Sequence, residues 1–174
     1  MAIRPILTSE KPVLHQKARP VQRVDGAVRK LLDDMVETMR AAPGVGLAAP
    51  QIGVPSRVTV IEYEDQLFKL VNPEVTWTSA EREVADEGCL SIPGYAGAVE
   101  RHCRVKVRAK DHKGKNVFIS ADGWLARIFQ HEIDHLDGIL FTDRMAPGER
   151  LHPVTDVEEG PVEETRELSR ASRD

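Results

Sequence analysis

The segment QHEIDHLDGILF, residues 130–141, limits what this chain can fold into more than any other part of its sequence. His131 and His135 are four residues apart, so a helix places both imidazoles on one face, with the Glu132 carboxylate beside them. Imidazoles held in this way are a common pair of metal ligands, and the carboxylate can then act as a base toward water. The segment therefore predicts a helix built around a metal site.

The surrounding sequence predicts that this helix runs from about Gly123 to Asp137, with Asp122 as its N-cap and Gly138 placed to end it. In helical projection both histidines lie on an apolar arc, so they face the interior of a largely buried helix. The apolar residues of the arc are Trp124, Leu125, Ile128, Phe129, Ile133 and Leu136, and the other side holds Arg127, Gln130, Asp134 and Asp137. A pair of hydrogen-bonded core histidines is the alternative interpretation. Metal ligation satisfies the buried imidazoles equally well, and it also explains Glu132.

A catalytic metal usually has three protein ligands and a water, so the two histidines need a partner. In the pattern HExxHxxGxxH a third histidine would stand where this chain has Phe141. The downstream candidates are Glu149, His152, Glu158 and Glu159. Upstream, Cys89 offers a thiolate, which is a strong ligand for zinc or ferrous iron. We favour Cys89 because the downstream candidates lie in a segment that we expect to be mobile, and we expect Cys103 to be a buried structural cysteine.

The rest of the chain predicts an α+β fold. Residues 25–40 have apolar side chains at helical spacing, with Asp25 placed to cap the start. Short β-prone runs occupy residues 57–61, 67–73, 104–109 and 116–120, and residues 112–115 resemble the turn of a hairpin. We therefore expect short antiparallel strands around a central HExxH helix, with the N-terminal amphipathic helix packed outside.

The 174 residues are enough for one domain with a core of its own. We expect this domain to span residues 1–145. Residues 146–174 are charged and short of large apolar side chains, so they are expected to form a mobile tail.

Charge and targeting signals narrow the function classes. The formal net charge of −4 argues against a direct nucleic-acid reader. The N-terminus has no apolar run long enough for an export signal or a membrane span, so a cytoplasmic location is expected.

Three motifs, in this order, resemble those of peptide deformylases: GVGLAAPQIG (44–53), EGCLS (87–91) and HEIDH (131–135). The resemblance extends from about residue 1 to residue 145. It implies a metal-dependent amide hydrolase that removes the N-formyl group from the N-terminal formylmethionine of new polypeptides and releases formate. It also implies the same α+β fold.

The resemblance assigns roles to individual residues. Cys89, His131 and His135 would hold one divalent metal ion, with a fourth position for water. Ferrous iron (Fe²⁺) would be the native metal, and Zn²⁺, Ni²⁺ or Co²⁺ could substitute for it. Glu132 would carry the proton from water to the departing amine, and the Gln51 side-chain amide and the Leu90 backbone N–H would stabilise the oxyanion.

The resemblance also implies how substrate is bound. Val45, Gly46 and Gly88 would let the N-formylmethionyl peptide lie like an added strand, and Val45 and Ile128 would line the methionine pocket. The charged groups expected to orient the metal ligands are Glu87, Arg101 and Asp134, and the alternative interpretation of Arg101 and Asp134 is that they are ordinary surface charges. Arg127 adjoins the pocket and would contact either substrate or solvent. The ribosome near its exit tunnel is a further expected partner, although the tail lacks the long C-terminal helix by which some bacterial deformylases dock there.

Two other functions remain open from the sequence. A zinc endopeptidase would use HExxH with a glutamate of the tail, so truncation after about residue 148 would abolish metal binding and Cys89→Ala would not. An inactive deformylase-like binding module would be expected to have lost at least one residue of the set Gln51, Cys89, His131, Glu132 and His135.

Overall fold

The computed structural model describes residues 2–154. The helices are α1 (Gly26–Ala41), α2 (Gly123–Leu136) and the 3-10 helices η1 (Pro12–His15), η2 (Ala49–Ile52) and η3 (Phe141–Arg144). The strands are β1 (Gly46–Ala48), β2 (Val58–Tyr63), β3 (Gln66–Thr78), β4 (Arg82–Cys89), β5 (Ile92–His102), β6 (Arg104–Lys110), β7 (Asn116–Asp122) and β8 (His152–Pro153).

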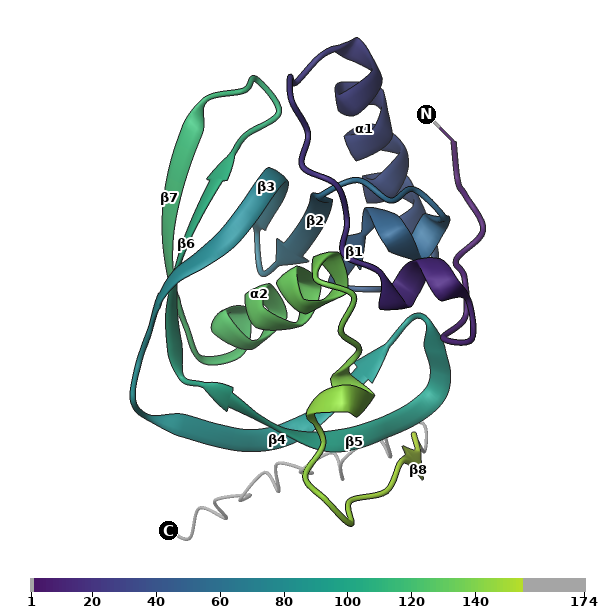
Figure 1. Cartoon of the computed structure of the whole chain (residues 1–174), viewed down its shortest axis with the longest axis vertical. Coiled ribbons are helices and arrows are strands. Elements are labelled where there is room, and N and C mark those ends of the chain that lie inside the picture. Colours follow the sequence, from purple (N-terminus) through teal and green to yellow (C-terminus); the bar gives the residue numbers. More distant parts are fainter. Residues whose placement is uncertain (1, 155–174) are drawn as a thin grey trace, which may run out of the picture.

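The strands form two antiparallel sheets. The larger sheet has the order β1-β2-β3-β6-β7, and the smaller one has the order β4-β5-β8. In Figure 1, α2 runs through the middle of the molecule, with β6 and β7 to one side of it and β4 and β5 below. The predicted α+β class with antiparallel strands is confirmed. None of the described helices combines the length and the apolar character needed to cross a membrane.

The larger sheet has a helix on each face. Val58 and Val60 of β2 pack with the buried side of α1, in the same cluster as Leu32 and Met35. Ile61, which points to the opposite face, packs in the cluster that contains Phe129 of α2. Because both faces of β2 are covered, its first four residues are all buried rather than alternating. This burial fixes α2 firmly against the sheet.

The ends of the two helices follow from local chemistry. The Asp25 carboxylate accepts a hydrogen bond from the Val28 N–H at 3.0 Å, as expected for an N-cap. Asp122 occupies the N-cap position of α2, but its side chain makes no capping hydrogen bond, so the predicted capping by this side chain was wrong. Gly138 follows α2 with φ +75°, and a Cβ there would lie 2.8 Å from the η1 backbone, so glycine is required.

The strands of the smaller sheet were not predicted from the sequence, because all four predicted β-prone runs lie in the larger sheet. Strands β4 and β5 are joined by the two-residue turn Leu90–Ser91, within the EGCLS motif, for which no strand was predicted. Cys103 follows β5 and is partly exposed, not buried as expected. The first residues of the predicted tail include β8, which pairs with β5, whereas residues 155–174 lie outside the described part of the chain. The domain boundary at residue 145 stays a prediction.

Candidate metal centre

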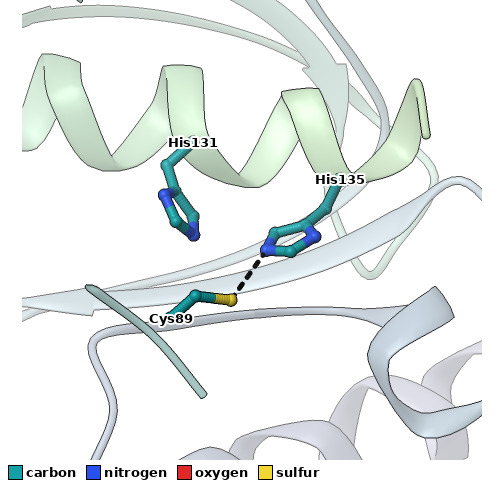
Figure 2. A group of neighbouring side chains, drawn as sticks. All are labelled: Cys89, His131 and His135. Atoms are coloured by element: carbon teal, nitrogen blue, oxygen red, sulfur yellow. Dashed lines mark hydrogen bonds between the residues drawn. The ribbon is translucent and has the colours of Figure 1, made fainter. Parts of the chain in front are cut away.

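Three potential metal ligands meet where the β4–β5 hairpin faces α2. Cys89 is the last residue of β4, and His131 and His135 project from successive turns of α2 toward it (Figure 2). Their ligand atoms all lie within 4.8 Å of one another, and Cys89 Sγ is 3.3 Å from His135 Nε2. Among residues 2–154, this is the one group of three cysteine, histidine or acidic side chains close enough to share an ion.

The donor set fits a divalent transition metal. A thiolate with two imidazoles suits iron, zinc, nickel or cobalt, and it leaves a position for water. Burial lowers the pKa of His135 well below its ordinary value, so this ring is neutral, as a metal ligand must be. Burial also disfavours the charged form of His131, but its interactions with Cys89 and Glu87 outweigh this and raise its pKa to about 10. A metal ion and a proton would therefore compete for a ring nitrogen of His131.

Glu132 lies beside the ligands in a closely packed position. The residue is 4% exposed, and one of its carboxylate oxygens, Oε2, has no hydrogen-bond partner among the described residues. Burial raises the pKa of Glu132 to about 7. The side chain packs directly over Gly46 of β1, where a Cβ would come within 2.7 Å of the Glu132 Cδ. Glycine at 46 is therefore what allows the carboxylate to occupy this place.

Gln51 is held in one orientation at the same point. Its Oε1 accepts a hydrogen bond from the Ala48 N–H at 2.9 Å, which directs the amide nitrogen the other way. That nitrogen donates to Ser91 Oγ at 3.1 Å and lies 3.5 Å from Cys89 Sγ. The side chain is almost fully buried, so it presents an N–H donor beside the ligand cluster without rotational freedom.

A buried ionic network surrounds Glu87, which bonds His131 Nδ1 through Oε2 at 3.0 Å. Arg101 donates to both Glu87 oxygens at 2.8 and 3.0 Å, and to Asp134 at 2.6 Å. Arg127 donates to Glu87 Oε1 at 3.0 Å. Burial alone would raise the pKa of Glu87, but hydrogen bonds from Arg101 and His131 outweigh it and hold the pKa at about 2. Glu87 therefore stays ionised and directs Nε2 of His131 toward Cys89.

A cavity of about 660 Å³ opens onto the cluster. One side is formed by β1 and the loop before it, and the other by β4, the Leu90 turn and the start of β5. Strands β1 and β4 each lie at the edge of their sheet. The predicted site residues that line the cavity are Val45, Gly46, Gln51, Gly88, Cys89, Leu90, Ile128, His131 and Glu132.

The structure thus brings together all the residues that the sequence analysis singled out for the site, with His135 just behind the cavity wall. It also adds residues that the sequence reading missed. Ser91 accepts from Gln51 and donates its N–H to Cys89 Sγ at 3.4 Å. Its place in the EGCLS motif was the sequence feature that could have identified Ser91 as a site residue. Trp124 and Tyr95 form parts of the wall, and Val154 from beyond β8 reaches it as well.

The comparison with known families identifies the chain. A sequence profile described as "Polypeptide deformylase" matches residues 3–151. The chain belongs to the polypeptide deformylase family. A peptide deformylase from Symbiobacterium thermophilum is 53% identical over 173 residues, which cover 97% of this chain and 76% of that relative. One from Heliobacterium modesticaldum is 54% identical over 83% of this chain and 95% of the relative.

Solved structures of the polypeptide deformylase family share the fold. Peptide deformylase from Thermotoga maritima superimposes with a TM-score of 0.82 at 40% identity, over 84% of this chain and 100% of that one. The structure from Synechococcus elongatus, which is a complex with actinonin, has a TM-score of 0.80 at 43% identity, over 82% of this chain and 78% of that one. The family implies a divalent metal, and the cluster of Cys89, His131 and His135 is able to hold one.

Proposed function

We propose that this protein hydrolyses the formyl amide at the N-terminus of formylmethionyl polypeptides and releases formate. One observation carries the proposal: a Cys-His-His ligand set, a buried carboxylate and an oriented amide donor converge at the base of a cavity between two strand edges. Family membership supports the same reaction.

Cys89, His131 and His135 would hold the metal, with ferrous iron as the proposed native ion and Zn²⁺, Ni²⁺ or Co²⁺ as substitutes. When bound, such a cation polarises the formyl carbonyl and makes water acidic enough to react near neutral pH. The neighbouring residues prepare this arrangement. Glu87 orients His131, and Ser91 and Gln51 contact the Cys89 sulfur. Arg101 and Asp134 act behind Glu87 as parts of the same network.

Substrate would bind in the cavity as an extended chain. Strands β1 and β4 have an edge that is not paired within either sheet, so a peptide between them can form backbone hydrogen bonds as an added strand. Gly46 and Gly88 line this space and allow close approach of a second backbone. Val45 and Ile128 provide apolar surface for the methionine side chain. Helix α2 would then be the central element of the domain, with α1 as the outer amphipathic helix.

Glu132 would carry the proton that the reaction has to move. Hydrolysis adds water across the C–N bond, so the water oxygen bonds to the formyl carbon while the amine nitrogen gains a proton. Glu132 is the buried carboxylate next to the ligand cluster, and its Oε2 has no bond within the described residues that would have to be broken first. It accepts a proton from water as the C–O bond forms and gives it to the nitrogen as the C–N bond breaks.

The oxyanion formed during attack needs donors that are fixed beforehand. The Gln51 Nε2 group is fixed by the Ala48 bond, and Leu90 lies in the turn that directly follows Cys89. We assign the Gln51 amide and the Leu90 backbone N–H to this role.

The substrates would be nascent chains, so we place the protein in the cytoplasm and include the ribosome near its exit tunnel as a proposed partner. The first experiment is formate release from an N-formyl-Met tripeptide, with protein purified without oxygen and its metal content measured. We expect formate from wild type and none above background from Glu132→Ala at equal metal content. Metal-loaded wild type that released no formate would refute the proposal and favour an inactive binding module.

The zinc endopeptidase alternative is tested by metal content after two changes. Truncation after residue 148 should leave metal binding intact, and Cys89→Ala should abolish it. The opposite pair of results would favour a ligand from the tail. His152, one of the tail candidates, instead contacts Asp86 at 3.1 Å and is half exposed.

A further inference from the structure

Arg127 has a place in the structure that the proposed reaction does not use. It lies on α2 and lines the cavity, yet the residue is only 5% exposed. Its Nη1 donates to Glu87 Oε1 at 3.0 Å and to the Val99 carbonyl at 2.8 Å, and its Nη2 donates to the Glu83 carbonyl at 2.8 Å. Both terminal nitrogens therefore bond to the protein, so neither of the two sequence-based expectations, contact with substrate or with solvent, accounts for this arginine.

The contacts of Arg127 join the two elements that supply the candidate ligands. Glu83, Glu87 and Val99 belong to the β4–β5 hairpin, whose first strand ends at Cys89. Arg127 lies one helical turn before His131. The position of Glu87 relative to α2 determines where its Oε2 meets His131 Nδ1. Arg127 fixes that position from the helix that carries the histidine.

Arg101 does not make this contact redundant. Arg101 is itself on β5, so its two bonds to Glu87 lie within the hairpin, and it reaches α2 only at Asp134, beyond His131. Arg127 and Arg101 therefore attach the hairpin to α2 on either side of His131. A buried carboxylate held from both sides has one orientation available.

We infer that Arg127 is a positioning residue for the metal centre, acting through Glu87 on the orientation of His131. This inference rests on the proposed metal site. This positioning role requires the forked guanidinium of arginine. Lysine at position 127 would keep the positive charge, but its single ammonium group could not donate to the Glu87 carboxylate and to both backbone carbonyls. The charge alone is therefore not what the site needs.

The test is a double-mutant cycle read out as metal affinity. Co²⁺ is titrated into the metal-free full-length protein, its binding is followed by the thiolate-to-cobalt absorption, and dissociation constants come from competition with a chelator. The variants are Arg127→Met, Arg127→Lys, Glu87→Gln and the double variant Arg127→Met/Glu87→Gln. Arg104→Met is the matched control, because Arg104 is an exposed arginine that pairs with Glu81 on the outer surface.

Arg127→Met and Arg127→Lys should each weaken Co²⁺ binding by about 10- to 100-fold, the range for residues behind a metal ligand. In the Glu87→Gln background, Arg127→Met should change the affinity by less than about twofold, because the group through which it acts is gone. The same substitution should lower resistance to urea in both backgrounds, since the bonds to Glu83 and Val99 carbonyls are lost in each. Arg104→Met should bind Co²⁺ like wild type.

Unchanged Co²⁺ affinity in Arg127→Met, or affinity losses that simply add in the double variant, would overturn the inference. If Arg127→Met does not fold, Arg127→Lys takes its place in the cycle, with the same two contradicting outcomes. Wild type without a Cys89-dependent absorption band would overturn the metal site and the inference together. A normal band in wild type with no effect of Arg127 would overturn the inference alone.

Discussion

Replacing Gly46 by alanine tests how closely Glu132 must be placed. A Cβ at position 46 would lie 2.7 Å from the Glu132 Cδ and 2.8 Å from its Cγ, whereas carbon atoms pack at about 3.5–4.0 Å. The carboxylate would therefore have to move by about 1 Å. A misplacement of that size costs on the order of 100-fold in rate when a group must meet its reaction partner in one geometry.

The effect on stability should be smaller than the effect on rate. Overpacking a buried site costs about 1–3 kcal/mol. Alanine in a strand recovers about 0.5–1 kcal/mol relative to glycine, and the φ of Gly46 is not positive, so the backbone accepts the change. We expect a net loss of about 1–2 kcal/mol in the free energy of unfolding. The ligand atoms themselves are not displaced, so metal content should stay that of wild type.

The assay is kcat for formate release from an N-formyl-Met tripeptide at equal metal content. The matched control is Gly26→Ala at the start of α1, where an added Cβ meets nothing within 4 Å. We expect kcat to fall by about 100-fold in Gly46→Ala and to be unchanged in the control. A folded, metal-loaded Gly46→Ala protein with kcat within twofold of wild type would refute the link between Gly46 and the position of Glu132.

Three further outcomes are expected. Gln51→Leu should lower kcat by about 100-fold or more with little change in KM, because an oxyanion donor acts in the transition state; a change in KM alone would contradict that role. Gly138→Ala should lower the free energy of unfolding by about 2–4 kcal/mol in urea titrations, since φ is +75° and the added Cβ meets backbone 2.8 Å away. Hydrogen bonds from Arg4 and Lys30 lower the pKa of Asp34 to about 2, so this ionised group stabilises the fold above about pH 4 and the effect is lost as the pH falls toward 2. Because Arg4 and Lys30 are partly exposed, Asp34→Asn should lower the free energy of unfolding by about 1 kcal/mol at pH 6 and by almost nothing near pH 2. An equal loss at both pH values would refute the role of the Asp34 charge.

The two helices could be located from sequence because their signals are local. In α1 the apolar spacing and the Asp25 cap coincide, and in α2 the glycine at 138 marks the end. Strand β4 was missed because most of its residues are charged and exposed, and β5 because Pro93, Gly94 and Gly97 interrupt the alternation that identifies a strand. Their turn, Leu90–Ser91, also lacks the Asn-Gly or Asp-Gly pair that usually marks a two-residue hairpin turn in a sequence.

The candidate site was predictable as a set of residues, and its supporting network was only partly so. Cys89, His131 and His135 belong to recognisable motifs, so their meeting could be expected. Arg127 and Gln130 lie on the polar side of the helical projection, which ordinarily faces water, but both are buried. The reason is that the β4–β5 hairpin covers this side of α2 and offers Arg127 the Glu87 carboxylate and two backbone carbonyl groups. A projection of one helix carries no information about what packs against it.

The two open strand edges have a consequence for the behaviour of the protein in a crowded cell. Unpaired backbone N–H and C=O groups recruit strands from other chains, which is why most proteins cover or charge them. Here the edges of β1 and β4 border one cavity instead of the outer surface. A folded neighbour cannot insert a strand there, but the free end of an unfolded chain can. The position of the β1 and β4 edges thereby favours extended chain ends over strands of folded neighbours before any side chain is recognised.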